Sequence, residues 1–154
     1  MNADLVVRNV RLEGRERPAS IAVAGGIITS IDEADHGPAT AAEAIDACGL
    51  MATPPFVDAH HHLDCAHLSE YVNHSGTLAE AIRINARITP DRAAAEVATK
   101  ASRALEEALL AGTCWIRSHV NVDSVSGLSL LHPVVEAAET FRGRVDVQVV
   151  AFPQ

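Results

Sequence analysis

The chain has 154 residues, of which 48% are hydrophobic, and a formal net charge of −8. This length and composition are enough to bury a core, which argues against a disordered protein. Nucleic acids and anionic membranes attract clustered Lys and Arg, so the negative charge argues against both as partners. We expect a folded protein whose partner is a small molecule.

The N-terminal residues lack the basic segment and the long apolar run of a secretory signal. No apolar stretch approaches the roughly 18 to 20 residues that span a bilayer. Cys48, Cys65 and Cys114 are far apart and odd in number, which argues against a disulfide framework or a thiolate zinc site. These features predict a cytoplasmic protein with free thiols.

Residues 1–53 are predicted to form a small module of short strands. Apolar residues partly alternate with polar ones there, as is typical of strands with one buried face. Gly25 and Gly26 predict a hairpin turn, because both can adopt the positive φ that a tight reversal needs. The expected strands are residues 5–12, 21–23, 27–31, 44–47 and 50–52.

From residue 54 onward, apolar strands are expected to alternate with helices. Thr77 and Glu80 have the spacing of a capping box, which predicts the start of one helix. Thr89 is expected to cap the next helix, with Pro90 at its first position. Such an alternation indicates a parallel sheet of right-handed βαβ units. The expected strands are residues 56–62, 113–120 and 145–151, and the expected helices are residues 78–88, 90–111 and 134–141.

The number of strands limits the fold. A closed eight-stranded α/β barrel takes about 250 residues, whereas residues 54–154 hold three barrel-type strands. Parallel strands also need cover on both faces of their sheet. We therefore predict an α/β fold, an incomplete (β/α) barrel made of its first three strands, which belongs to a larger protein.

His60 and His62, at the end of the first parallel strand, are the strongest candidates for a metal site. Side chains two residues apart on a strand point the same way, so these imidazoles and Asp58 are expected on one face and His61 on the other. Cα atoms about 6.5 Å apart let both rings reach one ion. A bound metal lowers the pKa of its water towards about 7, which supplies hydroxide for hydrolysis. An isolated pair is more often solvated, but a barrel places its active site at this end of its strands.

Four segments of the chain match a known pattern: residues 54–64, 73–78, 117–120 and 149–154. The first resembles the P-x-F-V-D-x-H-x-H signature of the amidohydrolase superfamily, and the others resemble its cytosine deaminase branch. The resemblance implies that residues 1–53 form part of a small N-terminal β-sandwich and that residues 54–154 form the first part of a metal-dependent hydrolase barrel. It implies that His60 and His62 bind iron or zinc. It also implies that Gln154 hydrogen-bonds the pyrimidine ring of the substrate.

The family's remaining catalytic groups have no counterpart in this chain. Its acid/base glutamate and histidine, its water-activating aspartate and a further metal-ligand histidine come from later strands, so no catalytic residue is expected before Gln154. We predict the N-terminal part of an enzyme that deaminates a cytosine-like ring, inactive as a separate chain. A triazine-type aminohydrolase is one alternative. The other alternative is a non-catalytic fragment that binds metal or pairs its sheet edge with another subunit. A homo-oligomer is also possible.

Five further side chains carry weaker expectations. His119 is expected to be a hydrogen-bonded core histidine rather than a site residue. Asp64 is expected to orient a metal ligand or the loop, and Asp58 to support a ligand from behind. Arg117 is expected to pair with a carboxylate. Asn85 stands where a tryptophan is usual in the family branch, which changes the expected shape of the pocket.

Overall fold

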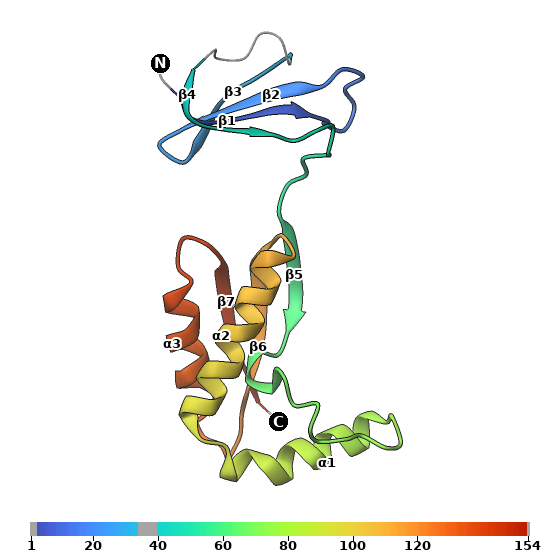
Figure 1. The fold of residues 1–154 in the computed structure, drawn as a ribbon. Coiled ribbons are helices and arrows are strands. Elements are labelled where there is room, and N and C mark those ends of the chain that lie inside the picture. Colours follow the sequence, from blue (N-terminus) through green and yellow to red (C-terminus); the bar gives the residue numbers. More distant parts are fainter. Residues whose placement is uncertain (1–2, 34–39, 154) are drawn as a thin grey trace. The chain divides into compact units, whose positions relative to one another are not determined.

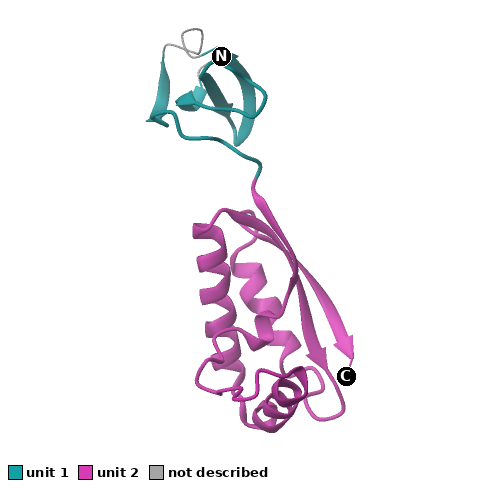
Figure 2. Ribbon diagram, turned by 90° about the vertical axis from the view of Figure 1, so that its right-hand side faces the viewer, with its two compact units in different colours: residues 1–54 teal, residues 55–154 magenta. Residues whose placement is uncertain are grey.

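The computed structural model describes residues 3–33 and 40–153. The chain divides into two compact units, residues 1–54 and residues 55–154 (Figure 2). This division lies one residue after the domain boundary expected between residues 53 and 54. Within the described ranges, none of the helices is long and apolar enough to cross a membrane.

The first unit contains a four-stranded sheet in the order β3-β2-β1-β4 (Figure 1). β1 pairs antiparallel with β2 and parallel with β4. Gly25 and Gly26, with φ of 60° and 77°, turn the chain between β2 and β3, which confirms the predicted hairpin. Met51 makes a single bridge to Arg11, so the strand expected over residues 50–52 is wrong. The strands are β1 (Ala3–Val10), β2 (Ala19–Ala24), β3 (Ile27–Glu33) and β4 (Ala41–Asp46).

The second unit has mixed α/β structure around a parallel sheet in the order β5-β6-β7 (Figure 1). Both strand pairs are parallel, which confirms the arrangement that the alternating pattern predicts. The strands are β5 (Phe56–His61), β6 (Thr113–Val122) and β7 (Asp146–Pro153). The helices are α1 (Leu78–Ile88), α2 (Ala94–Leu110) and α3 (Leu131–Thr140), with short 3-10 turns η1 (Leu63–Cys65) and η2 (Thr89–Asp91).

One face of the β5-β6-β7 sheet is covered by α2 and α3. Ile116 and Val120 of β6 are buried there in one core with Leu105 of α2 and Val134 of α3. Trp115, on the opposite face of β6, is 47% exposed. A parallel sheet needs cover on both faces, so this second face is the one that an incomplete barrel leaves open. The barrel itself stays a prediction.

α2 begins four residues later than the capping pattern of Thr89 and Pro90 predicts. Residues 89–91 form the 3-10 turn η2 instead. Arg92 then adopts extended backbone with ψ of 117°, which interrupts the helix, and its side chain is buried. α2 starts at Ala94 without a side-chain cap. The burial of Arg92 is a tertiary effect that a capping pattern does not register.

Candidate metal centre

His60 is the penultimate residue of β5 and His62 follows the strand directly, so both lie at its carboxyl end. Their ring centroids are 5.1 Å apart and the ring planes are inclined by 68°. Two imidazoles that share a tetrahedral ion through bonds of about 2.0 to 2.1 Å have centroids about 5 Å apart. The two rings therefore fit a shared divalent ion.

A β-bulge in β5 changes the face to which Asp58 belongs. Asp58 pairs with Ile116 and His61 with Ser118, so three residue steps along β5 match two along β6. Asp58 and His61 consequently share one face, where His61 Nδ1 is 2.9 Å from Asp58 Oδ2. The expectation that Asp58 shares a face with the histidine pair is wrong. Asp58 still supports the pair, because its Oδ1 accepts the backbone N–H of His60 at 3.1 Å.

His119 of β6 stacks on His60. Their ring centroids are 4.2 Å apart with planes inclined by 23°, and His119 lies 5.9 Å from His62. Two imidazoles bound to one tetrahedral ion have ring centroids about 5 Å apart, so the closer His60 and His119 rings do not fit a shared ion. The stacking instead fixes the orientation of the His60 ring. Burial, and then the charges of His60, His62 and Arg117, lower the pKa of His119, which keeps its ring neutral at pH 7.

Sequence reasoning favoured a core position for His119 over one that faces the site, and a core position for Phe152 over one beside the substrate ring. Phe152 of β7 stands edge-on to His62 and His119, with centroid distances of 5.7 Å and 5.9 Å. His119 is not the core residue that was expected, because it is half-buried and packs on the exposed ring of His60. The sequence did carry one signal for both residues, which is their position near the ends of the second and third parallel strands. The carboxyl ends of adjacent parallel strands meet at one edge of the sheet, so these residues are expected near His60 and His62.

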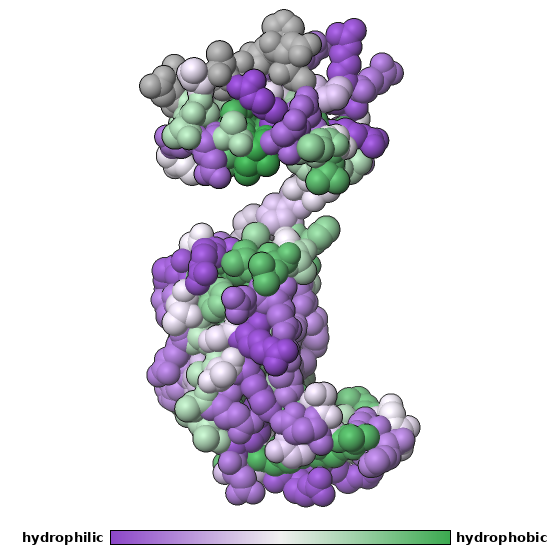
Figure 3. All heavy atoms as spheres, viewed as in Figure 1, coloured by the Kyte–Doolittle hydropathy of each residue, from purple (hydrophilic) through white to green (hydrophobic). Residues whose placement is uncertain are grey.

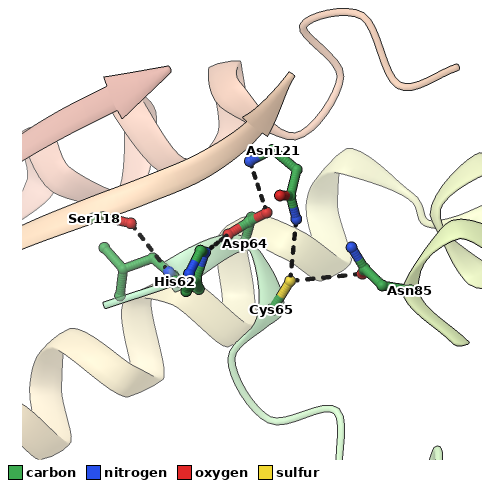
Figure 4. A network of polar contacts seen from close by, with 7 residues as sticks. His62, Asp64, Cys65, Asn85, Ser118 and Asn121 are labelled. Atoms are coloured by element: carbon green, nitrogen blue, oxygen red, sulfur yellow. Dashed lines mark hydrogen bonds and ion pairs between the residues drawn. The ribbon is translucent and has the colours of Figure 1, made fainter. Parts of the chain in front are cut away.

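Asp64 is fully buried behind His62 (Figure 4). Its Oδ2 accepts the backbone N–H of Asn121 at 3.1 Å. Its Oδ1 lies 4.0 Å from His62 Nδ1 and, in the part of the chain that the structure describes, accepts no hydrogen bond. A carboxylate behind one ring nitrogen of a histidine leaves the other nitrogen free for a metal. The unpaired carboxylate oxygen is therefore a second feature that fits a metal ligand at His62.

The turn that follows β5 is tied to β6 and α1 by a chain of polar contacts (Figure 4). The Leu63 backbone N–H donates to Ser118 Oγ at 3.1 Å. Cys65 Sγ accepts from Asn121 Nδ2 and donates to Asn85 Oδ1, both at 3.6 Å. Asn85 thus helps to hold the turn that carries His62 and Asp64.

Cys65 is expected to resist thiol reagents while Cys48 reacts. Burial, and then the charge of Asp64, raise the pKa of the Cys65 thiol to about 12. Because the thiolate is the reactive form, roughly one Cys65 side chain in ten thousand is reactive at pH 8. Cys48 is exposed. Iodoacetamide at pH 8, followed by peptide mass spectrometry, should label Cys48 within minutes and Cys65 only after unfolding. Equal labelling rates in the folded chain would contradict the half-buried position and raised pKa of Cys65.

The remaining expected site residues have mixed outcomes. Gln154, the expected substrate-binding residue, lies outside the described residues. Arg117 donates to Gln148 Oε1 at 2.7 Å, so the expected carboxylate partner is wrong. Among residues 3–33 and 40–153, no group of three or more His, Cys, Asp or Glu side chains is placed to hold a metal ion. The candidate site in the described chain thus consists of two imidazoles and the groups that hold them.

Comparisons with known proteins relate the chain to hydrolases of nitrogen-containing rings. No family model matches it. N-isopropylammelide isopropyl amidohydrolase from Pseudomonas sp. (strain ADP) is 31% identical over 98% of this chain and 38% of the relative. The crystal structure of N-isopropylammelide isopropylaminohydrolase from Burkholderia multivorans has a TM-score of 0.81 and 33% identity over 100% of this chain and 38% of that one.

Two further solved structures extend this likeness. The 5-methylcytosine deaminase of Klebsiella pneumoniae has a TM-score of 0.81 and 30% identity over 95% of this chain and 36% of that one. The atrazine chlorohydrolase of Arthrobacter aurescens, solved in complex with zinc, shares the fold with a TM-score of 0.70, 20% identity, and coverage of 96% of this chain and 35% of that one. The chain spans 38% of the length of the curated relative that it matches. In sequence and fold, it belongs to the amidohydrolase superfamily and corresponds to part of one of its hydrolases.

Proposed function

We propose that His60 and His62 bind one divalent ion, iron or zinc, in a metal-dependent amidohydrolase of which this chain is the N-terminal part. The observation that carries the proposal is the pair of rings 5.1 Å apart at the carboxyl end of β5. Such an ion, when bound, supplies hydroxide at neutral pH by lowering the pKa of a water towards about 7. Residues 1–53 would then be a portion of the enzyme's β-sandwich, and residues 54–154 the first three strands of its barrel.

The chain's own residues would prepare the two ligands. Asp64 would accept a hydrogen bond from the Nδ1–H of His62, which leaves the lone pair of Nε2 for the ion. His119 would fix the plane of the His60 ring by stacking on it, and its lowered pKa keeps a positive charge away from the ion. Phe152 would shield the edges of His62 and His119 from water.

The proposed substrate is a nitrogen heterocycle with an exocyclic amino group, and the reaction is its hydrolytic deamination. The relatives' names support this class: they act on isopropylammelide and on 5-methylcytosine, with identities of 31% and 30% to this chain. Because the two identities differ by so little, they do not favour a cytosine-like substrate over a triazine-like one. Gln154 would bind the ring edge, because an amide donates and accepts at once.

A non-catalytic fragment that pairs its sheet with another subunit is the second candidate function. The observation that favours it is the open face of the sheet, where Trp115 is 47% exposed and Val57 is 64% exposed. Another subunit or a second copy of the chain could cover this face, and a partner strand could pair with the edge of the same sheet. The cytoplasmic location and a homo-oligomeric state stay predictions.

An ammonia-release assay tests the proposed function. The purified chain of 154 residues, loaded with iron or zinc, is expected to release no ammonia from cytosine, because it supplies no positioned acid or base. A protein read from the same gene beyond codon 154, if the frame continues, is expected to contain the missing histidine, glutamate and aspartate and to deaminate a ring substrate. Turnover by the 154-residue chain alone would overturn the predicted inactivity. A stop codon directly after Gln154 would favour the second candidate.

A further inference from the structure

A pocket of about 620 Å³ is bordered by α1 and by residues 70–74, which precede this helix along the chain. Arg83 and Arg87 of α1 line it, and neither has a hydrogen-bond or ion-pair partner in the part of the chain that the structure describes. We propose that this pocket binds a small oxyanion with two negative charges, held between the two guanidinium groups. The proposal goes beyond the proposed function and does not depend on it, because no residue of the candidate metal centre lines the pocket.

The two arginines lie on one face of α1. They are four residues apart, so their backbone positions are separated by about 6 Å along the helix axis. Like charges at this spacing repel each other, and an anion between them would remove the repulsion. A guanidinium group matches the planar oxygen pair of a carboxylate or a phosphate. Both arginines are exposed, so an anion from solution reaches them.

The carboxylates that line the same pocket already have partners within the chain. The two oxygens of Glu80 accept the backbone N–H groups of His74 and Ser75, at 3.2 Å and 2.6 Å. Glu70 forms an ion pair with Lys100 of α2. These acidic groups are thus engaged elsewhere, whereas the two guanidinium groups remain without a counter-charge. An anion from outside the chain would supply it.

The charged side chains around the 500 Å³ cavity of the second unit are arranged differently, because each has a partner in the chain. The pairs are Arg142 with Glu139, Arg117 with Gln148, Asp146 with Trp115, and Asp58 with His61. Of these two charged cavities, the one beside α1 is therefore the one that offers unpaired positive charge to a ligand.

The size and the surroundings of the pocket favour a small molecule. Its volume of 620 Å³ falls within the range of small-molecule sites, about 300 to 1,000 Å³. Tyr71 and His74 are also in the lining and bring further hydrogen-bond donors. Figure 3 shows hydrophilic side chains along α1 beside a smaller hydrophobic area. A nucleic acid or an anionic membrane needs a wider basic surface, and the net charge of −8 repels both.

Titrations with inorganic phosphate and with succinate test the inference. Each anion is added to the chain at pH 8 and low salt, without added metal, and backbone amide shifts are followed by NMR. Saturable shifts are expected at residues 71–74 and 80–87. Arg83→Gln and Arg87→Gln should each weaken binding about tenfold, because each variant loses a charge-assisted contact. The double variant should not bind either anion.

Arg103→Gln is the matched control. Arg103 pairs with Glu107 on α2 and does not line the pocket, yet its replacement changes the net charge by the same amount. It should leave both affinities within about twofold, since exposed charges at a distance are screened.

The two anions distinguish the sources of the same chemistry. Tighter binding of phosphate would assign the pocket to a phosphorylated ligand, and tighter binding of succinate to a dicarboxylate. The proposal is wrong if neither anion gives saturable shifts, if the double variant still binds, or if Arg103→Gln weakens binding as much as the α1 variants do. Zinc binding by the double variant should be unchanged, so a failure of anion binding leaves the proposed function untouched.

Discussion

Replacing His62 by alanine is expected to lower the zinc affinity of the chain by at least about 100-fold. With the ring removed, His60 is left as a single imidazole, and one neutral ligand holds a hydrated ion weakly. His60→Ala should have an effect of the same size, because the two rings lie 5.1 Å apart and would share one ion. Competition calorimetry with a chelator of known affinity measures the change.

His61→Ala is the matched control for these two variants. His61 is the central residue of the same triplet, but its ring contacts Asp58 on the other face of the strand. Its removal should leave the zinc affinity within about twofold of the original. A fall of equal size in all three variants would mean that zinc binds the triplet without regard to its geometry, and the proposed site would be wrong.

Asp64→Asn is expected to lower the zinc affinity about 10- to 100-fold, the range typical of removing a carboxylate behind a metal ligand. Asp64 Oδ2 accepts the Asn121 N–H, so an asparagine would keep its oxygen there and turn its NH₂ towards His62 Nδ1. An N–H in that place favours the tautomer with its proton on Nε2, which removes the lone pair that a metal needs.

Nitrogen chemical shifts of the His62 ring distinguish this mechanism from general damage to the fold. They should report a proton on Nδ1 in the original chain and on Nε2 in Asp64→Asn. Glu106→Gln, an exposed carboxylate on α2, serves as the control and should change neither the shifts nor the affinity. Unchanged zinc binding in Asp64→Asn would show that the buried carboxylate has no part in the site.

Local signals in the sequence predict the elements that local chemistry determines. Gly25 and Gly26 form the hairpin that their positive φ allows. Thr77 accepts the backbone N–H of Glu80 at 3.3 Å and caps α1, as the capping-box spacing predicts. Gly112, at φ of 87°, follows the last turn of α2. In each case a few neighbouring residues decide the conformation, so the pattern is sufficient.

The features that sequence reasoning misplaced depend on contacts between distant segments. The strand period assigned Asp58 to the face of His60, but the bulge in β5 adds a residue step and moves Asp58 to the face of His61. A regular period cannot reveal a bulge that arises from pairing with β6.

The neighbours of the histidine pair show the same limit. His119 was expected in the core, whereas the pairing of β5 with β6 brings its ring onto His60. Asp64 was expected to orient a metal ligand or the loop, and the turn η1 buries its carboxylate behind His62. The H-x-H spacing in the sequence pointed to His60 and His62 as the proposed ligands. The fold adds the neighbours that position them, namely Asp58, Asp64 and His119.

X-ray absorption at the zinc edge tests the central claim most directly. A chain loaded with one equivalent of zinc should show two imidazole ligands, completed by oxygen or nitrogen atoms at about 2.0 to 2.2 Å. The imidazole scattering should disappear in the His60→Ala, His62→Ala double variant. A sulfur ligand at about 2.3 Å, or an unchanged spectrum in the double variant, would contradict the assignment of His60 and His62 as metal ligands.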